Sequence, residues 1–121
     1  MLSTLHNRAY QDFIALLTNF ANNVQNQSDR SAIKQEFVSL QQWFVENIDH
    51  LDESGIEEAY IPRWQSIQRE INREFKLLTT DILFLASARI EATKTKRLKS
   101  ISDRLAKLIS YCQAILRETQ N

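Results

Sequence analysis

The chain has 121 residues, and its 15 Lys and Arg side chains balance its 15 Asp and Glu side chains. This length fits one compact domain over residues 1–121, and 43% apolar residues are enough to build a hydrophobic core. One Gly and one Pro leave little for tight hairpin turns, which argues against β-sandwiches, β-barrels and repeated βαβ units. The single Cys excludes an internal disulfide framework and suits a reducing compartment.

The sequence gives no membrane or secretory signal. The N-terminus has no basic region ahead of an apolar stretch. The most apolar window, Leu77 to Ile90, contains Asp81 and Arg89 and is shorter than the roughly 20 apolar residues of a membrane span. We therefore expect a cytoplasmic protein without a membrane span.

Apolar residues recur at spacings of three and four along most of the chain, which is typical of amphipathic helices. The pattern predicts helices over residues 3–25, 29–50, 62–92 and 96–118. Short connections make consecutive helices antiparallel, so we predict an all-α fold, an up-and-down antiparallel four-helix bundle. The alternative is that long helices share a core in a homodimer.

Capping residues indicate where the helices begin and end. Ser28 or Asp29 can cap the second helix, and Gly55 can adopt the left-handed conformation that ends it. Pro62 suits the first turn of the third helix, where a backbone N–H has no partner to lose.

The boundary between the third and fourth helices carries neither Gly nor Pro. One continuous helix from Pro62 to Glu118 would be about 85 Å long, too long for a domain of this size. The apolar stripe loses its phase between Ala92 and Leu98. We therefore predict a tight turn within residues 93–96, capped by a threonine at position 93 or 95.

Charges of one sign gather near two of the predicted turns. The turn between the second and third helices is acidic, with Glu46, Asp49, Asp52, Glu53, Glu57 and Glu58. The turn between the third and fourth helices is basic, with Lys94, Lys96, Arg97 and Lys99. In an up-and-down bundle these turns lie at opposite ends. Both clusters are either ordinary solvated charges or surfaces for an oppositely charged partner.

Some apolar residues lie beside the main stripes. The third helix has a second row of Leu77, Phe84 and Ala88, and the second helix has Trp43 and Val45. A wide stripe would bury these residues, whereas an exposed row would offer a groove for a partner helix or a second copy. The candidate partner-binding residues are Trp43, Leu77, Phe84, Lys94, Lys96, Arg97 and Lys99. We expect reversal of the four basic residues to Glu to preserve helicity and to weaken partner binding.

Two polar side chains fall within apolar stretches. Asp81 lies between the two rows of the third helix, and we expect it to form an ion pair with a base of the fourth helix, since an unpaired buried charge is costly. Cys112 lies in the stripe of the fourth helix and has no neighbouring His, so we interpret it as a buried core residue rather than a nucleophile.

The sequence contains no constellation that supports catalysis. His6 and His50 are far apart, and the Glu-x-x-His signature of di-iron bundles is missing. Glu46 and His50 are four residues apart, as a surface pair at a helix end would be. One Gly cannot make a Gly-rich phosphate loop. We therefore predict a non-enzymatic protein and assign no catalytic, cofactor-binding or metal-binding residue.

Nucleic-acid binding is an alternative use of the basic turn, which has Arg89, Arg104 and Lys107 nearby. Aromatic residues that would stack bases are not interleaved with these cations, and a helix-turn-helix glycine turn is missing. We therefore rank nucleic acid below protein as the partner.

Four segments together resemble the family of cyanobacterial heterocyst frequency control protein PatD. They are AYQDF at 9–13, QQWF at 41–44, EINREFKLLTTDILFLASAR at 70–89 and SDRLAKLISYCQAIL at 102–116. The resemblance covers nearly the whole chain, but its segments are helix patterns without a catalytic motif. It implies a regulator of how many cells in a filament become heterocysts, acting without enzymatic activity or a known cofactor. Such a protein would act by binding a differentiation regulator or the division machinery.

Overall fold

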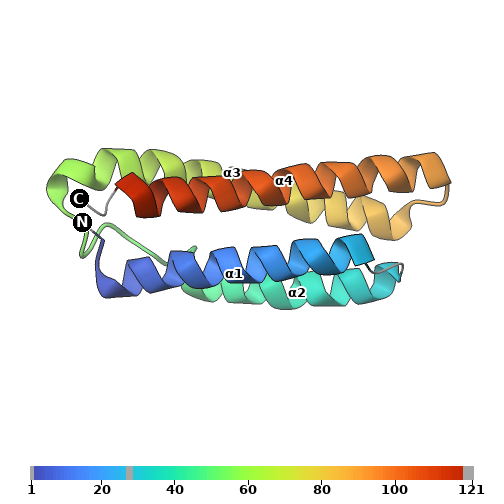
Figure 1. Cartoon of the computed structure of the whole chain (residues 1–121), viewed down its shortest axis with the longest axis horizontal. Helices are drawn as coiled ribbons and strands as arrows, with labels where there is room; N and C mark the ends of the chain where they lie inside the picture. The colour runs from blue at the N-terminus through green and yellow to red at the C-terminus, as the bar shows by residue number, and fades with distance from the viewer. Residues whose placement is uncertain (1, 27–28, 119–121) are drawn as a thin grey trace.

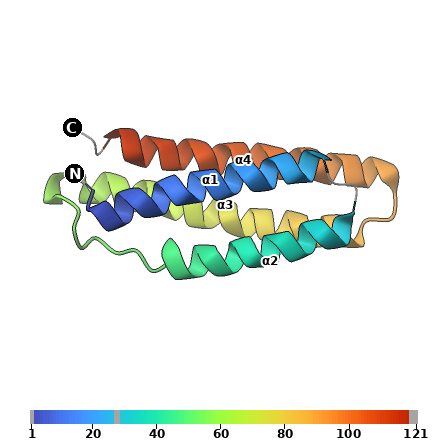
Figure 2. The same cartoon turned by 60° about the horizontal axis from the view of Figure 1, so that its bottom comes forward.

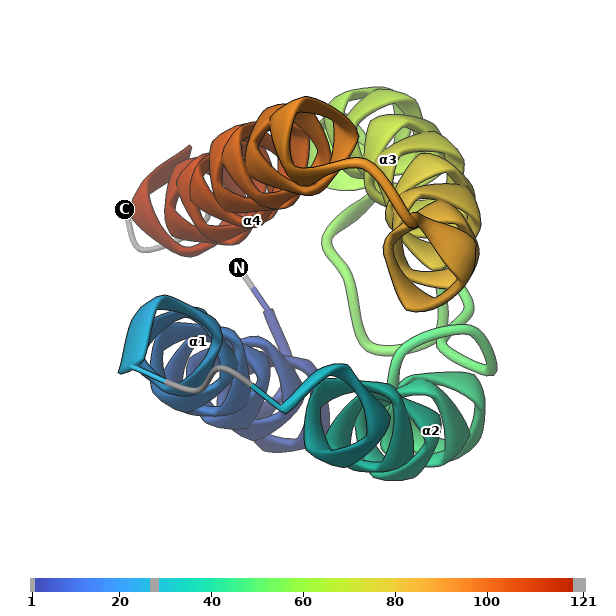
Figure 3. The same cartoon turned by 90° about the vertical axis from the view of Figure 1, so that its right-hand side faces the viewer.

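The computed structural model describes residues 2–26 and 29–118, and within them it contains four α-helices and no strand. The helices are α1 (Thr4–Asn26), α2 (Arg30–Asn47), α3 (Ile61–Ser87) and α4 (Glu91–Glu118), and a short 3-10 helix, η1 (Glu58–Tyr60), precedes α3. They run alternately up and down one long axis (Figure 1). The end view places them in chain order around a square, with α1 beside both α2 and α4 (Figure 3). The predicted up-and-down bundle is therefore confirmed.

The core is formed by the apolar stripe of each helix and is rich in aromatic rings. Phe44 of α2 stacks on Phe75 of α3 with ring centroids 4.0 Å apart and planes 5° apart. Phe13 of α1 and Phe37 of α2 also pack against Phe75. Truncation of such a buried Phe to Ala costs about 3–5 kcal/mol. These rings therefore fix α1, α2 and α3 against one another.

A chain of buried hydrogen bonds connects α1, α2 and α3 in the part of the core near the α2–α3 connection. The indole N–H of Trp64 donates to the Tyr10 hydroxyl at 2.7 Å, and this hydroxyl donates to Gln68 Oε1 at 2.7 Å. Gln68 Nε2 then donates to the carbonyl oxygen of Ile48, the residue that ends α2, at 3.0 Å. Burial raises the pKa of the Tyr10 hydroxyl well above its usual value. The phenol therefore stays protonated and can donate.

Three of the predicted boundary residues have the expected type of conformation. Asp29 caps α2, since its carboxylate accepts a hydrogen bond from the Ser31 N–H at 2.9 Å. Ser28, the other predicted cap, lies outside the described residues. Pro62 is in the first turn of α3. Gly55 has a positive φ of 84°, but α2 already ends at Asn47, so Gly55 turns the α2–α3 connection and does not end the helix.

The predicted turn within residues 93–96 is wrong. Helix α3 ends at Ser87, Ala88 is extended, and α4 begins at Glu91. The Thr95 hydroxyl donates to the Glu91 carbonyl oxygen inside α4, so it does not cap the helix. The physical reason for the earlier break is a tertiary contact, because the guanidinium of Arg30 in α2 donates to the carbonyl oxygens of Leu85 and Ala88. The Leu85 carbonyl oxygen also accepts the Ala88 N–H at 3.2 Å, and Arg30 adds a charged donor to the carbonyl groups at the end of α3.

Candidate interaction surfaces

The α3–α4 connection lies at one end of the bundle (Figure 2), and basic residues of the sequence gather around it. The first residue of α2 and the start of α4 lie at this end, so cations from both helices meet there. We define the basic end by the side chains of Arg30, Lys34, Arg89, Lys94, Lys96 and Lys99. A hollow of about 500 Å³ between the two helices is lined by Arg30, Lys34 and Lys94. The sequence patterns missed Arg30 and Lys34, although the predicted topology places the start of the second helix at this end.

Arg97 does not belong to this free basic surface. Its guanidinium donates to Asp81 Oδ1 at 3.1 Å and lies 4.6 Å from the centre of the Phe84 ring. Of the four predicted basic residues, Arg97 takes part in the α3–α4 contact. We therefore expect changes of Lys94, Lys96 and Lys99 to leave this contact intact. Lys94 pairs with Glu91 and Lys99 pairs with Asp103, each within α4, and such local ion pairs contribute little to stability.

The expected ion pair of Asp81 is confirmed and is part of a larger network. Asp81 is 3% exposed and accepts hydrogen bonds from Arg97, from the Ser100 hydroxyl at 2.7 Å and from Arg104 Nε at 2.6 Å. Arg104 also contacts Glu74, which is 1% exposed, at 3.2 Å. Burial lowers the pKa of Arg104, but the hydrogen bonds and charges of the two carboxylates outweigh this and raise it. The network explains why two buried acids are tolerated between α3 and α4.

Phe84 is 49% exposed despite its contact with Arg97, and two other apolar residues near the end of α3 are also exposed. Leu83 precedes it, and Ile90 in the α3–α4 connection is 68% exposed. The predicted row of Leu77, Phe84 and Ala88 is not continuous, because Leu77 is half-buried and Ala88 is buried. The exposed apolar surface therefore lies at the basic end and does not run along α3.

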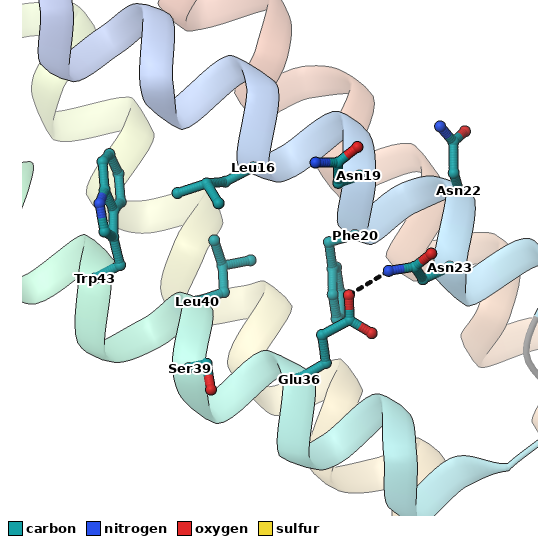
Figure 4. Close-up of a pocket in the computed structure, with 9 residues that line it drawn as sticks. All are labelled: Leu16, Asn19, Phe20, Asn22, Asn23, Glu36, Ser39, Leu40 and Trp43. Atoms are coloured by element: carbon teal, nitrogen blue, oxygen red, sulfur yellow. Dashed lines mark hydrogen bonds between the residues drawn. The ribbon is translucent and has the colours of Figure 1, made fainter.

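Trp43 faces a groove between α1 and α2 (Figure 4). The indole is half-buried and stacks on Phe13, with ring centroids 5.8 Å apart. Leu16, Phe20 and Leu40 extend the apolar lining, and the groove has a volume of about 550 Å³. A hydrogen bond from Asn23 to Glu36 crosses it from α1 to α2. Trp43 is therefore a partly buried residue that packs against the core and lies more than two helical turns along α2 from Lys34 of the basic end.

The α2–α3 connection forms the acidic end. We define the acidic end by the side chains of Glu46, Asp49, Asp52, Glu53, Glu57 and Glu58. It lies at the opposite end of the bundle from the α3–α4 connection (Figure 1), so the predicted separation of charge along the bundle is correct. Hydrogen bonds from Ser54 keep the pKa of Asp52 below its usual value.

His6 attaches this connection to α1. The ring is buried, and its Nε2–H donates to the carbonyl oxygen of Asp52 at 2.7 Å. A carbonyl can only accept, so in the neutral ring Nδ1 accepts from the Ser3 hydroxyl at 2.6 Å. Gly55 lies close to Ser3, since a Cβ added to Gly55 would be 2.8 Å from Ser3 Cβ. The sequence offered His6 only as an unmatched histidine, because its partner in the α2–α3 connection is a backbone carbonyl group 46 residues away.

Cys112 is fully buried, as predicted, and burial raises the pKa of its thiol to about 12. It therefore stays a thiol at neutral pH. Within residues 2–26 and 29–118, no group of three His, Cys, Asp or Glu side chains could hold a metal ion. In the same residues, no helix has the length and apolar character needed to cross a bilayer.

Comparisons of the chain with protein-family models, with curated proteins and with solved structures found no match.

Proposed function

We propose that this protein is a non-enzymatic regulatory module of the cytoplasm that acts through protein–protein contacts made by its basic end. The observation that supports this most is the half-exposed ring of Phe84 near the end of α3, where Leu83 of the same helix and Ile90 of the following connection are exposed as well and where the basic side chains gather. Large exposed aromatics are frequent anchors of protein interfaces. Surrounding cations raise the association rate and favour acidic partners. This combination fits a partner that presents an apolar side chain among carboxylates.

The biological role we propose is control of heterocyst frequency in filamentous cyanobacteria. It is supported by the resemblance of four sequence segments to the PatD family. The partner on this proposal is a differentiation regulator or a protein of the division machinery. A protein that binds and does not catalyse would set heterocyst frequency by its concentration and by how much partner it holds.

The test uses a basic-end variant, Lys94→Glu with Lys96→Glu and Lys99→Glu, which spares Arg97. Its control, Arg69→Glu with Lys76→Glu and Arg117→Glu, makes the same change of net charge at exposed positions elsewhere. Each protein replaces the endogenous homologue in a heterocyst-forming strain, and heterocysts are counted along the filaments. We expect the wild type and the control to restore the frequency and the basic-end variant to fail. Restoration of the frequency by the basic-end variant would exclude the basic end as the partner-binding surface. No effect of the wild type would exclude the role in heterocyst frequency.

Binding of nucleic acid is the second candidate, because six basic side chains meet at the basic end. Counterion release would make DNA affinity fall by about 10³-fold or more between about 50 and 200 mM salt for a surface with this many phosphate contacts. Fluorescence anisotropy with a labelled duplex measures this directly. Binding that is undetectable at about 50 mM salt would remove this candidate.

A further inference from the structure

The two ends of the bundle are complementary in charge, and both carry side chains that lack an ion-pair partner. Arg89 and Lys96 at the basic end form no ion pair within the described residues, and neither do Glu46 and Asp49 at the acidic end. The acidic and basic ends are separated by the length of the helices (Figure 1). They therefore cannot neutralise each other within one molecule, but they can between two.

The basic end also carries an apolar projection. Ile90 is 68% exposed in the short connection between α3 and α4, and Arg89 precedes it. Its carbonyl oxygen accepts the N–H of Lys94, so the start of α4 holds its backbone in place. A fixed, exposed aliphatic side chain among cations is suited to insertion into an apolar hollow with an acidic rim.

Such a hollow lies beside the acidic end. It has a volume of about 230 Å³, and its apolar lining comes from Leu5, Ala9, Trp43 and Leu51. Leu5 is 69% exposed, so part of this lining faces solvent. An apolar cavity of about 150 Å³ can hold a benzene-sized group, so the hollow has room for an isoleucine side chain.

The rim of this hollow is mixed but carries more acids than strong bases. Asp12 and Glu46 line it together with Arg8 and His50, and Asp49 adjoins it in sequence. Two carboxylates against one guanidinium give the Asp, Glu and Arg side chains of this lining a sum of one negative charge at neutral pH. A cationic partner surface would therefore meet complementary charge there.

From these features we infer that the protein associates head to tail with a second copy of itself. Ile90 of one copy enters the hollow lined by Leu5, Trp43 and Leu51 of the next, and Arg89 and Lys96 face Glu46 and Asp49. Each copy offers both surfaces, so the contact is heterologous and can extend into an open chain. This differs from a two-fold homodimer, in which one surface would meet its own copy.

The inference does not depend on the proposed regulatory partner, because purified protein alone tests it. Sedimentation velocity is measured from about 10 µM to about 1 mM, a range suited to weak specific contacts. Salt is set at about 10 mM and at about 1 M, where charges are screened beyond roughly 30 Å and 3 Å respectively. We expect the average mass to rise above that of the monomer with concentration at low salt and to stay near it at high salt. A wild type that stays monomeric at low salt and about 1 mM would overturn the inference.

Two sets of variants locate the contact. Ile90→Ser should remove association, whereas Val38→Ser, at an exposed valine in the middle of α2, should leave it unchanged. Arg89→Glu with Lys96→Glu makes the two charge pairs of the contact acidic on both sides, and Glu46→Lys with Asp49→Lys makes them basic on both sides. Each charge variant alone should be monomeric, and an equimolar mixture should associate again. Association of Ile90→Ser equal to wild type, or a mixture that stays monomeric, would contradict this contact. Circular dichroism of each variant checks that the bundle is folded.

Discussion

The guanidinium of Arg30 donates a hydrogen bond to the carbonyl oxygen of Leu85, 3.0 Å away, and so joins the beginning of α2 to the end of α3. It also donates to Ala88, the residue after the last turn of α3. The last carbonyl groups of a helix lack partners within that helix. One side chain of α2 therefore contributes to where α3 stops and to where the basic α4 begins.

Arg30→Met should destabilise the protein by about 1–3 kcal/mol, because it leaves two partly buried carbonyl oxygens without a charged donor. The matched control is Lys34→Met, one turn further along α2 in the same basic hollow. Urea unfolding followed by circular dichroism gives both free energies. An equal loss of free energy of unfolding in the two variants would mean that the positive charge at this end contributes the stability, and that the hydrogen bonds of Arg30 do not.

Asp81→Asn should be among the most damaging single changes, with a loss of about 3–5 kcal/mol, because it removes a buried carboxylate that faces Arg97 and Arg104. The control Asp103→Asn removes only the exposed pair with Lys99 and should change stability by about 0.5 kcal/mol or less. Thermal unfolding at fixed pH compares them. If both variants unfolded at the wild-type temperature, the network would not stabilise the α3–α4 contact.

Gly55→Ala should destabilise the protein by about 1–3 kcal/mol, since the residue would have to keep a positive φ. Its new Cβ would also collide with Ser3 Cβ, so the α2–α3 connection would shift away from α1. Ala59→Ser, at an exposed position of the same connection, is the control. Hydrogen exchange of residues 48–57 should speed up in Gly55→Ala alone. Exchange as slow as in the wild type would show that the connection tolerates a side chain there.

The buried thiol of Cys112 should react with a thiol reagent at pH 8 only as fast as the protein unfolds, because its pKa is raised to about 12. Its ordinary pKa is about 8.5 to 9, so the folded state holds this proton more tightly than the unfolded state. The stability that this provides is complete below pH 8.5 and is lost as the pH rises toward 12. Urea unfolding between pH 8 and pH 11 should give a falling free energy, with a shallower fall for Cys112→Ala. Rapid labelling of the native protein would contradict the burial.

The fold could be predicted from the sequence because each helix has its own apolar stripe and its own local signals, such as Asp29 and Pro62. The α3–α4 boundary could not, because it depends on Arg30, which is more than 50 residues away in sequence. Because the turn was placed five residues too late, Arg97 was grouped with the basic side chains of the turn, whereas it lies well inside α4 and pairs with Asp81.

The candidate site was predictable in part for the same reason. Local clusters of like charge identified both ends of the bundle. For the second apolar row the sequence left burial and exposure open, and Phe84 is exposed. Arg30 and Lys34 joined the basic end only through the tertiary arrangement. Ile90 was missed, because an apolar residue in a predicted helix is expected to be buried, and here it falls in a connection.

The most direct test of binding through the basic end is capture of partners on the wild type, the basic-end variant and the matched control from a lysate of a heterocyst-forming cyanobacterium, with and without nuclease treatment. Mass spectrometry then compares the proteins retained at equal bait loading. We expect a specific protein that is retained by the wild type and the control and is reduced at least tenfold, about 1.4 kcal/mol, on the basic-end variant. Equal retention by all three proteins, or retention that disappears with the nuclease, would contradict it.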